Sequence, residues 1–241
     1  VVRVGERQSG EVDVTLDYAG INLREGLQGL DFLEADWADV PERQRSIRTV
    51  FDGAWNLLTE PEREVFQALS VFSGGFTRAA AQHVSGASLP ELRALAEKSL
   101  LEVTPSGRYQ IHDLLRQYAA EKLDSSRGAT TDARDRHCAY YLAALQRWGA
   151  DLIGARREAA AGDLEAELGN IHTAWAWAAE RGQVEQLGAA MYALQHFHWQ
   201  SGRFREGVAA FQAAATAAKA GAEEAAAAGT DDKATCLRVW A

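Results

Sequence analysis

Residues 98–123 read KSLLEVTPSGRYQIHDLLRQYAAEKL, and this stretch decides the fold of the first half of the chain. Leu100–Thr104 and Arg108–Ile111 have the composition of strands, and Pro105-Ser106-Gly107 between them favours a turn, so a β-hairpin is predicted. A helix follows at once, from His112 or Asp113 to Leu123, because apolar residues recur there at helical spacing.

Several helices are predicted before the hairpin. An apolar stripe between Arg45 and Leu58 marks the first of them. Capping boxes at Thr59-Glu60-Pro61-Glu62 and Ser88-Leu89-Pro90-Glu91 start two more. Thr77 caps a short helix that lies between those two. Helices, a hairpin and a closing helix in this order describe a winged helix, which we place at residues 42–124.

The rest of the chain is predicted to be helical. Residues 125–132 form a polar linker, and residues 133–241 carry four apolar stripes with tight glycine turns at 181–183 and 201–203. The stripes are Tyr141, Leu145, Trp148 and Leu152; Leu168, Ile171, Trp175 and Ala178; Leu187, Ala190, Met191, Leu194 and Phe197; and Phe204, Val208, Phe211 and Ala215. This pattern indicates tetratricopeptide-like (TPR-like) hairpins. The predicted fold class is mainly α, a winged helix followed by an α-α solenoid.

The two ends of the chain give weaker signals. Residues 1–41 are expected to be an N-terminal segment, either a linker or the remnant of a lid. Within it, Val12–Leu16 alternates weakly and favours one strand or a tail, and residues 23–36 favour a short helix. The chain begins with Val1 and stops within the helix-like segment Lys233–Ala241. We therefore expect both ends to be cut and the repeats to be truncated.

Composition excludes several classes of protein. A net charge of −9 over 241 residues argues against a general attraction to nucleic acid or to an anionic membrane. No run approaches the roughly 18 apolar residues that a membrane helix needs, and no signal peptide is recognisable. The two cysteines, Cys138 and Cys236, are far apart, which favours a reducing compartment. We expect a cytoplasmic protein.

No catalytic or metal-binding motif is found in the sequence. A Gly-rich phosphate loop and an Asp-rich magnesium strand are both missing, and Gly74-Gly75 is interpreted as a helix break. His137-Cys138 are neighbours that a helix points about 100° apart, so a Cys-His catalytic pair is not expected. His196 and His198 are two residues apart and do not share a helix face. We therefore expect no enzyme activity, no metal and no cofactor in this chain.

A winged helix raises the question of DNA binding. The usual recognition helix would be Leu89–Ser99, where Arg93 and Lys98 are offset by two glutamates, and the hairpin tip adds Arg108. Major-groove binding normally needs clustered Lys and Arg. We therefore predict a protein-packing module and do not expect nucleic acid as a partner.

The sequence resembles the winged-helix region and the following helical repeats of bacterial STAND-class (NB-ARC-like) signalling ATPases, which include many multidomain transcriptional regulators. The likeness spans roughly residues 30–220. In the first part it rests on Arg45-Ser46-Ile47-Arg48, Trp55-Asn56-Leu57-Leu58, Glu64-Val65-Phe66, Leu69-Ser70-Val71-Phe72, Gly74-Gly75-Phe76, Lys98-Ser99-Leu100-Leu101 and Ile111-His112-Asp113-Leu114-Leu115-Arg116-Gln117-Tyr118-Ala119. In the second it rests on Arg136-His137, Tyr140-Tyr141-Leu142, Glu167, Asn170-Ile171, Ala174-Trp175, Gly202-Arg203 and Glu206-Gly207.

The resemblance implies a role for one residue. Ile111-His112-Asp113 matches the family's Met-His-Asp motif, with Ile in place of Met, and the histidine of that motif contacts the β-phosphate of bound ADP. His112 would make this contact only together with a nucleotide-binding domain, which this sequence lacks. The residues alone allow a simpler interpretation, in which Asp113 caps the helix and His112 packs at its edge.

We therefore expect a non-catalytic regulatory and sensor part of a larger ATPase. Its expected partners are the nucleotide-binding domain of the same parent, which would hold ADP or ATP, and a protein or small-molecule ligand on the repeats. Two alternatives stay open: a freestanding winged-helix DNA-binding regulator with a helical effector domain, and a TPR-like scaffold protein.

Overall fold

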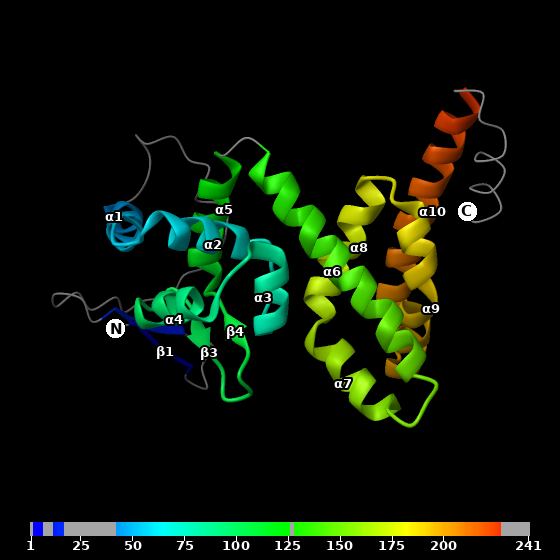
Figure 1. Ribbon diagram of the computed structural model, residues 1–241, viewed down its shortest axis with the longest axis horizontal. Helices are drawn as coiled ribbons and strands as arrows, with labels where there is room; N and C mark the ends of the chain where they lie inside the picture. Colours follow the sequence, from blue (N-terminus) through cyan, green and yellow to red (C-terminus); the bar gives the residue numbers. More distant parts are fainter. Residues whose placement is uncertain (1, 7–11, 17–41, 126–127, 228–241) are drawn as a thin grey trace.

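The computed structural model describes residues 2–6, 12–16, 42–125 and 128–227. Its described part is mainly helical (Figure 1). The elements are β1 Val2–Glu6, β2 Val12–Leu16, α1 Glu42–Asn56, α2 Glu60–Leu69, α3 Arg78–Ser85, α4 Leu89–Glu97, β3 Glu102–Val103, β4 Tyr109–Gln110, α5 Asp113–Asp124, α6 Ala129–Asp151, α7 Arg157–Ala166, α8 Leu168–Glu180, α9 Val184–Ser201 and α10 Phe204–Ala227. The helices expected at 23–36 and 233–241 lie outside the described residues.

The predicted helix starts in the first half are confirmed. The Thr59 amide donates to the Glu62 carboxylate over 2.7 Å at the start of α2, and the Ser88 amide donates to Glu91 over 2.7 Å at α4. Thr77 accepts from the amide of Ala80 at the start of α3. These side chains satisfy amides that a helix start leaves without partners.

The hairpin is shorter than predicted. Only Glu102–Val103 and Tyr109–Gln110 pair as strands, around a turn in which Gly107 has φ 76°. Leu100 and Leu101 lie in the core and follow Ser99, which has φ 59°, so they belong to the exit from α4. Because Leu100 and Leu101 are buried in the core, the first strand of the hairpin begins only at Glu102.

At the N-terminus, the single strand considered for Val12–Leu16 is one half of a hairpin. Val2–Glu6 pairs with it in antiparallel fashion, with Val2 opposite Leu16.

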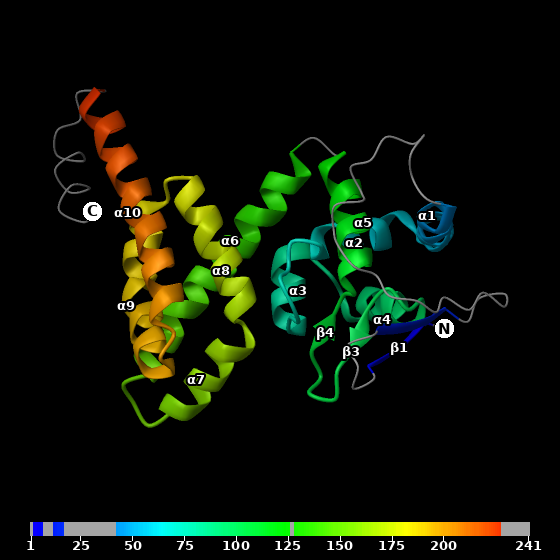
Figure 2. The ribbon, with the colours of Figure 1, turned by 180° about the vertical axis from the view of Figure 1, so that it is seen from behind.

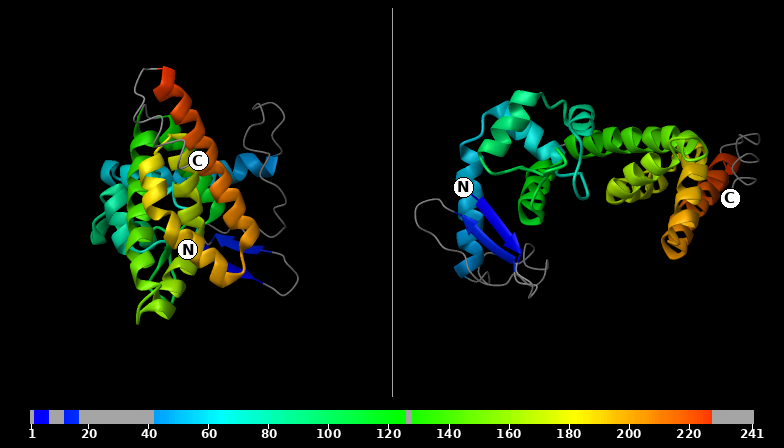
Figure 3. Two further views of the ribbon diagram at one scale, coloured as in Figure 1. Left: turned by 90° about the vertical axis from the view of Figure 1, so that its right-hand side faces the viewer. Right: turned by 90° about the horizontal axis from the view of Figure 1, so that it is seen from below.

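The long helix α6 joins two groups of elements, α1–α5 with β3 and β4 on one side and α7–α10 on the other (Figures 2 and 3). It begins at Ala129, so the predicted linker 125–132 is too long: its last four residues already belong to α6. An apolar core runs without a break from α2 through α6 to α9.

The apolar stripes of the repeats are confirmed except for the first half of the last one. In the second half of that stripe, Phe211 does pack against Trp175. Trp175, Leu187 and Leu194 are buried as expected, but Phe204 and Val208 are each 55% exposed. The inner face of α10 instead carries small residues, including Gly207, Ala214 and Ala218. A Cβ on Gly207 would lie 3.3 Å from His198, so close helix packing favours small side chains over the larger ones of the predicted stripe.

None of the helices in the described ranges combines the length and the apolar composition that a membrane crossing requires.

Candidate functional site

His112, the residue that the sequence singles out, is the N-cap of α5. Its Nδ1 accepts a hydrogen bond of 3.3 Å from the amide of Leu114, and its side chain is half-buried. Asp113 does not cap the helix and instead meets Arg116 at 3.3 Å. Because Nδ1 is an acceptor here, the ring proton lies on Nε2, for which no hydrogen-bond partner is found within the described ranges.

The single arginine of the hairpin lies in a contact between the two halves of the molecule. Arg108 Nη1 donates to Glu167 Oε1 over 2.7 Å, and its Nη2 donates to the Gly75 carbonyl over 2.7 Å and to the Ala166 carbonyl over 3.3 Å. Glu167 connects α7 to α8, so the hairpin is bound directly to the helical repeats. Arg108 is consequently directed toward protein and not toward a nucleic-acid phosphate.

Glu167 is the centre of a buried polar cluster. Besides Arg108, it accepts from the Tyr141 hydroxyl over 2.9 Å and from the Asn170 amide over 3.0 Å, and it is 5% exposed. We call Arg108, Tyr141, Glu167 and Asn170 the junction. The hydrogen bond to Glu167 raises the pKa of Arg108. Burial, and next the charge of Glu167, raise the pKa of Tyr141.

Asn170 extends the junction to the α2–α3 connection. Its Oδ1 accepts from the Ser73 amide over 2.8 Å, and its Nδ2 donates to the Gly75 carbonyl over 3.0 Å. The backbones are close as well, because a Cβ on Gly169 would lie 2.6 Å from the Ser73 carbonyl oxygen. Breaking one member of such a network leaves buried groups without partners, which costs several kcal/mol for a charged group.

The three cations considered as possible DNA contacts form ion pairs with glutamates. Arg93 pairs with Glu97 at 2.8 Å on the surface of α4, and Lys98 pairs with Glu62 at 2.6 Å. Arg93, Lys98 and Arg108 therefore each have a carboxylate partner.

The neighbouring histidine and cysteine of α6 have separate surroundings. His137 Nε2 lies 3.4 Å from Asn170 Oδ1, whereas Cys138 Sγ lies 3.4 Å from the Ala174 carbonyl. Burial lowers the pKa of His137 to about 4 and raises that of Cys138 to about 11. A thiol that holds its proton beside no paired imidazole does not form an activated nucleophile.

The side chains of His196 and His198 also have different surroundings. His196 meets Gln200 at the surface, whereas His198 is buried and its ring centroid lies 5.7 Å from that of His172. Within the described ranges, no group of three His, Cys, Asp or Glu residues is arranged to hold a metal ion.

The comparisons with known proteins give relatives but no family model. Two relatives, from Mycobacterium tuberculosis and Mycobacterium bovis, are 31% identical over 229 residues and are named as candidate HTH-type transcriptional regulators. The match covers 86% of this chain but 26% of each relative, so the chain spans about a quarter of their length. No family model matches.

One solved structure shows a slight likeness. It is a signal transduction ATPase with numerous domains (STAND) with a tetratricopeptide repeat sensor, from Pyrococcus horikoshii. Its TM-score is 0.35 and its identity 16%, over 78% of this chain and 32% of that one, which is too slight to establish a shared fold.

The junction is not predicted from the sequence. Glu167 and Asn170 are among the residues that carry the family resemblance, and the sequence offers Arg108 only as a possible DNA contact. Arg108 and Glu167 are 59 positions apart, and nothing in the local pattern of either indicates the other. The one available signal is that Glu167 and Asn170 lie three positions apart next to the apolar stripe of Leu168 and Ile171.

Proposed function

We propose that this chain is the non-catalytic regulatory and sensor part of a STAND-type signalling ATPase of the bacterial cytoplasm. Residues 42–124 form a winged helix that couples nucleotide state to domain opening. The helices from α6 onward form TPR-like repeats that bind a ligand or a partner protein. The nucleotide-binding domain belongs to the rest of the parent protein.

The observation that carries this proposal is the junction. A winged helix that reads DNA needs its hairpin and recognition helix free, but here Arg108 is 21% exposed and paired with Glu167. A hairpin fixed to the repeats can instead transmit a displacement from the repeats to α5, because β4 leads into α5 through Ile111 and His112. The order of α2, α3, α4, hairpin and α5 supports the winged-helix assignment.

His112 is the proposed contact with the nucleotide. Its Nδ1 is held by the α5 backbone, so Nε2–H is available to donate to a phosphate of ADP on the nucleotide-binding domain. Capping fixes the ring at the start of a helix, where an anion is also favoured by the helix dipole. Release of this contact would favour the open, active state of the parent.

The test uses the full-length parent protein and a fluorescent ADP analogue. We expect His112→Ala to speed nucleotide release by about tenfold, the effect of losing roughly 1.4 kcal/mol of binding. The matched control is His196→Ala, which removes a surface imidazole of α9. Equal release rates for the two variants, or a parent that binds no nucleotide, would refute the proposal.

A second candidate function is favoured by the names of the mycobacterial relatives. A regulator that binds DNA through α4 would have to free Arg93 and Lys98 from their carboxylates. An electrophoretic shift series at physiological salt distinguishes the two: we expect at most weak, competitor-sensitive binding by this chain. Nanomolar binding that survives competitor DNA would establish the regulator instead.

A further inference from the structure

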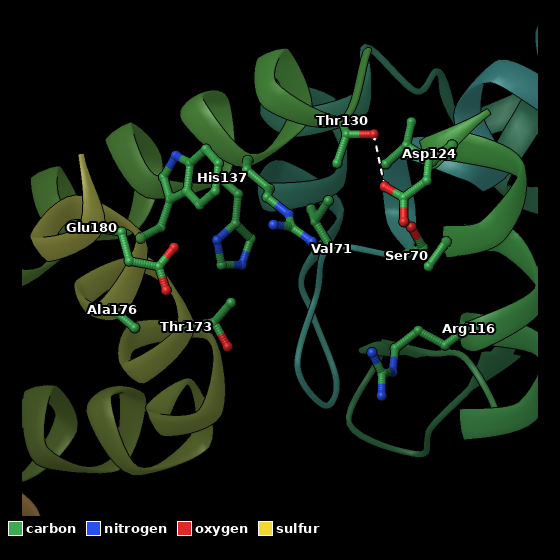
Figure 4. Close-up of a pocket in the computed structure, with 13 residues that line it drawn as sticks. Ser70, Val71, Arg116, Asp124, Thr130, His137, Thr173, Ala176 and Glu180 are labelled. Atoms are coloured by element: carbon green, nitrogen blue, oxygen red, sulfur yellow. Dashed lines mark hydrogen bonds between the residues drawn. The ribbon is translucent and has the colours of Figure 1, made fainter. Parts of the chain in front are cut away.

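A cavity of about 360 Å³ lies between the two halves of the molecule. Its walls come from α5, α6 and α8 and from Ser70 and Val71 after α2. Figure 4 shows His137 near the middle, with Thr173, Ala176 and Glu180 of α8 on one side and Asp124 and Arg116 of α5 on the other. This volume is within the range of small-molecule sites.

The hydrogen bonds of the junction determine what His137 offers to this cavity. The Ser73 amide can only donate, so the atom of Asn170 that it meets is the oxygen. That oxygen also meets His137 Nε2, which must therefore carry the ring proton. Nδ1 is left as an acceptor, and no partner for it is found in the described part of the chain. His137 is 2% exposed and is one of the residues that line the cavity.

The charged groups of the cavity are of both signs and do not pair with one another. Arg116 meets Asp113, outside the cavity, at 3.3 Å, and the Arg134 guanidinium lies 5.1 Å from the Trp177 ring centroid. Asp124 accepts a hydrogen bond of 3.0 Å from Thr130, and Glu180 also lines the space. The remaining walls are largely apolar, with Val71, Leu123, Ala176 and Trp177.

We propose that this cavity binds a small zwitterion of the amino-acid type with an apolar side chain. The ligand's carboxylate would meet Arg116 and Arg134, and its ammonium group would donate to Nδ1 of His137. The carboxylates of Asp124 and Glu180 balance the ammonium charge. The apolar walls take the side chain, which gains free energy by leaving water.

A ligand in this place bridges the two halves, because Arg116 belongs to α5 and Arg134 to α6. It would stabilise the arrangement that the junction defines, by an amount that grows with the ratio of ligand concentration to Kd. This consequence, and not the binding itself, rests on the proposed regulatory function: the ligand would then set how firmly α5 and His112 are held.

The test is calorimetric titration of this chain with L-leucine and L-phenylalanine. We expect saturable binding with a Kd below about 1 mM for at least one of them. N-acetyl-L-leucine and L-leucinamide, which lack the ammonium and the carboxylate charge, should each bind at least about tenfold more weakly. Absence of saturable binding for both amino acids, or equal binding of the blocked derivatives, would overturn the proposal.

Variants locate the site. Arg116→Gln and Arg134→Gln each remove one of the two cations that line the cavity. Both should weaken binding by about tenfold or more with little change in the thermal midpoint, because neither arginine is buried. Arg147→Gln, an exposed position on the same helix, is the control and should bind as the unchanged chain does. Unaltered affinity in both cavity variants would refute the site.

This outcome is separable from that of the proposed function. Binding is measured on the chain without nucleotide, and ADP release is measured on the parent without amino acid. If the chain does not bind amino acids but His112→Ala still speeds ADP release from the parent, the ligand site is refuted and the proposed nucleotide contact is not.

Discussion

Replacing Arg108 by methionine tests whether the junction holds the two halves together. Methionine keeps the apolar stem but removes the cation that faces Glu167, whose side chain is 6% exposed. Breaking a buried ion pair by removing one partner costs about 3–5 kcal/mol. The Arg108 side chain is 21% exposed, so water relieves part of this cost and we expect about 3 kcal/mol.

A double-mutant cycle separates the ion pair from general loss of packing. Glu167→Gln keeps an acceptor for Tyr141 and Asn170, and in Arg108→Met/Glu167→Gln no charge is left buried without a partner. The double variant should therefore lose less stability than the sum of the single variants, with a coupling of about 2 kcal/mol.

The assay is urea unfolding of this chain, in which the free energy of unfolding is extrapolated to water. The exposed pair Arg93 and Glu97, with side chains 78% and 63% exposed, is the control, and its coupling should stay below about 0.5 kcal/mol. Equal couplings for the two pairs would show that the junction contributes no more than a surface ion pair, and the coupling mechanism would lose its structural basis.

Three further predictions concern glycine and histidine positions. Gly169→Ala should cost about 1–3 kcal/mol in urea unfolding, because its Cβ would lie 2.6 Å from a backbone oxygen, whereas Gly162→Ala, with open space around it, should not destabilise the chain. Burial lowers the pKa of both His172 and His198, so below about pH 6.5 the unfolded chain binds more protons than the folded chain. The free energy of unfolding should therefore fall as the pH drops below that value. In thermal melts, the midpoint of His198→Phe should fall less over the same pH range than that of the unchanged chain. His112→Ala should cost about 0.5–2 kcal/mol, as expected for a lost helix cap, and a cost near zero would show that the Nδ1 contact does not stabilise α5.

The sequence by itself determined the local elements. The capping residues Thr59, Thr77 and Ser88 start helices as predicted, because a cap acts on amides within three positions and needs no distant partner. The helix after the hairpin is likewise correct to within a residue. The mainly helical fold and the apolar stripe around Trp175 follow from spacing alone.

Contacts between residues far apart in the sequence follow only from the tertiary structure. Arg108 was available to DNA, solvent or protein by its sequence, and packing of the hairpin against α7 and α8 brings it to Glu167. The packing of α10 against α9 likewise places Phe204 outside and Gly207 inside, where a Cβ would lie 3.3 Å from His198. The partner of Arg108 and the burial of Gly207 depend on where helices far apart in the chain meet. The free energy gained by burying a side chain depends on those contacts, which the local sequence does not specify.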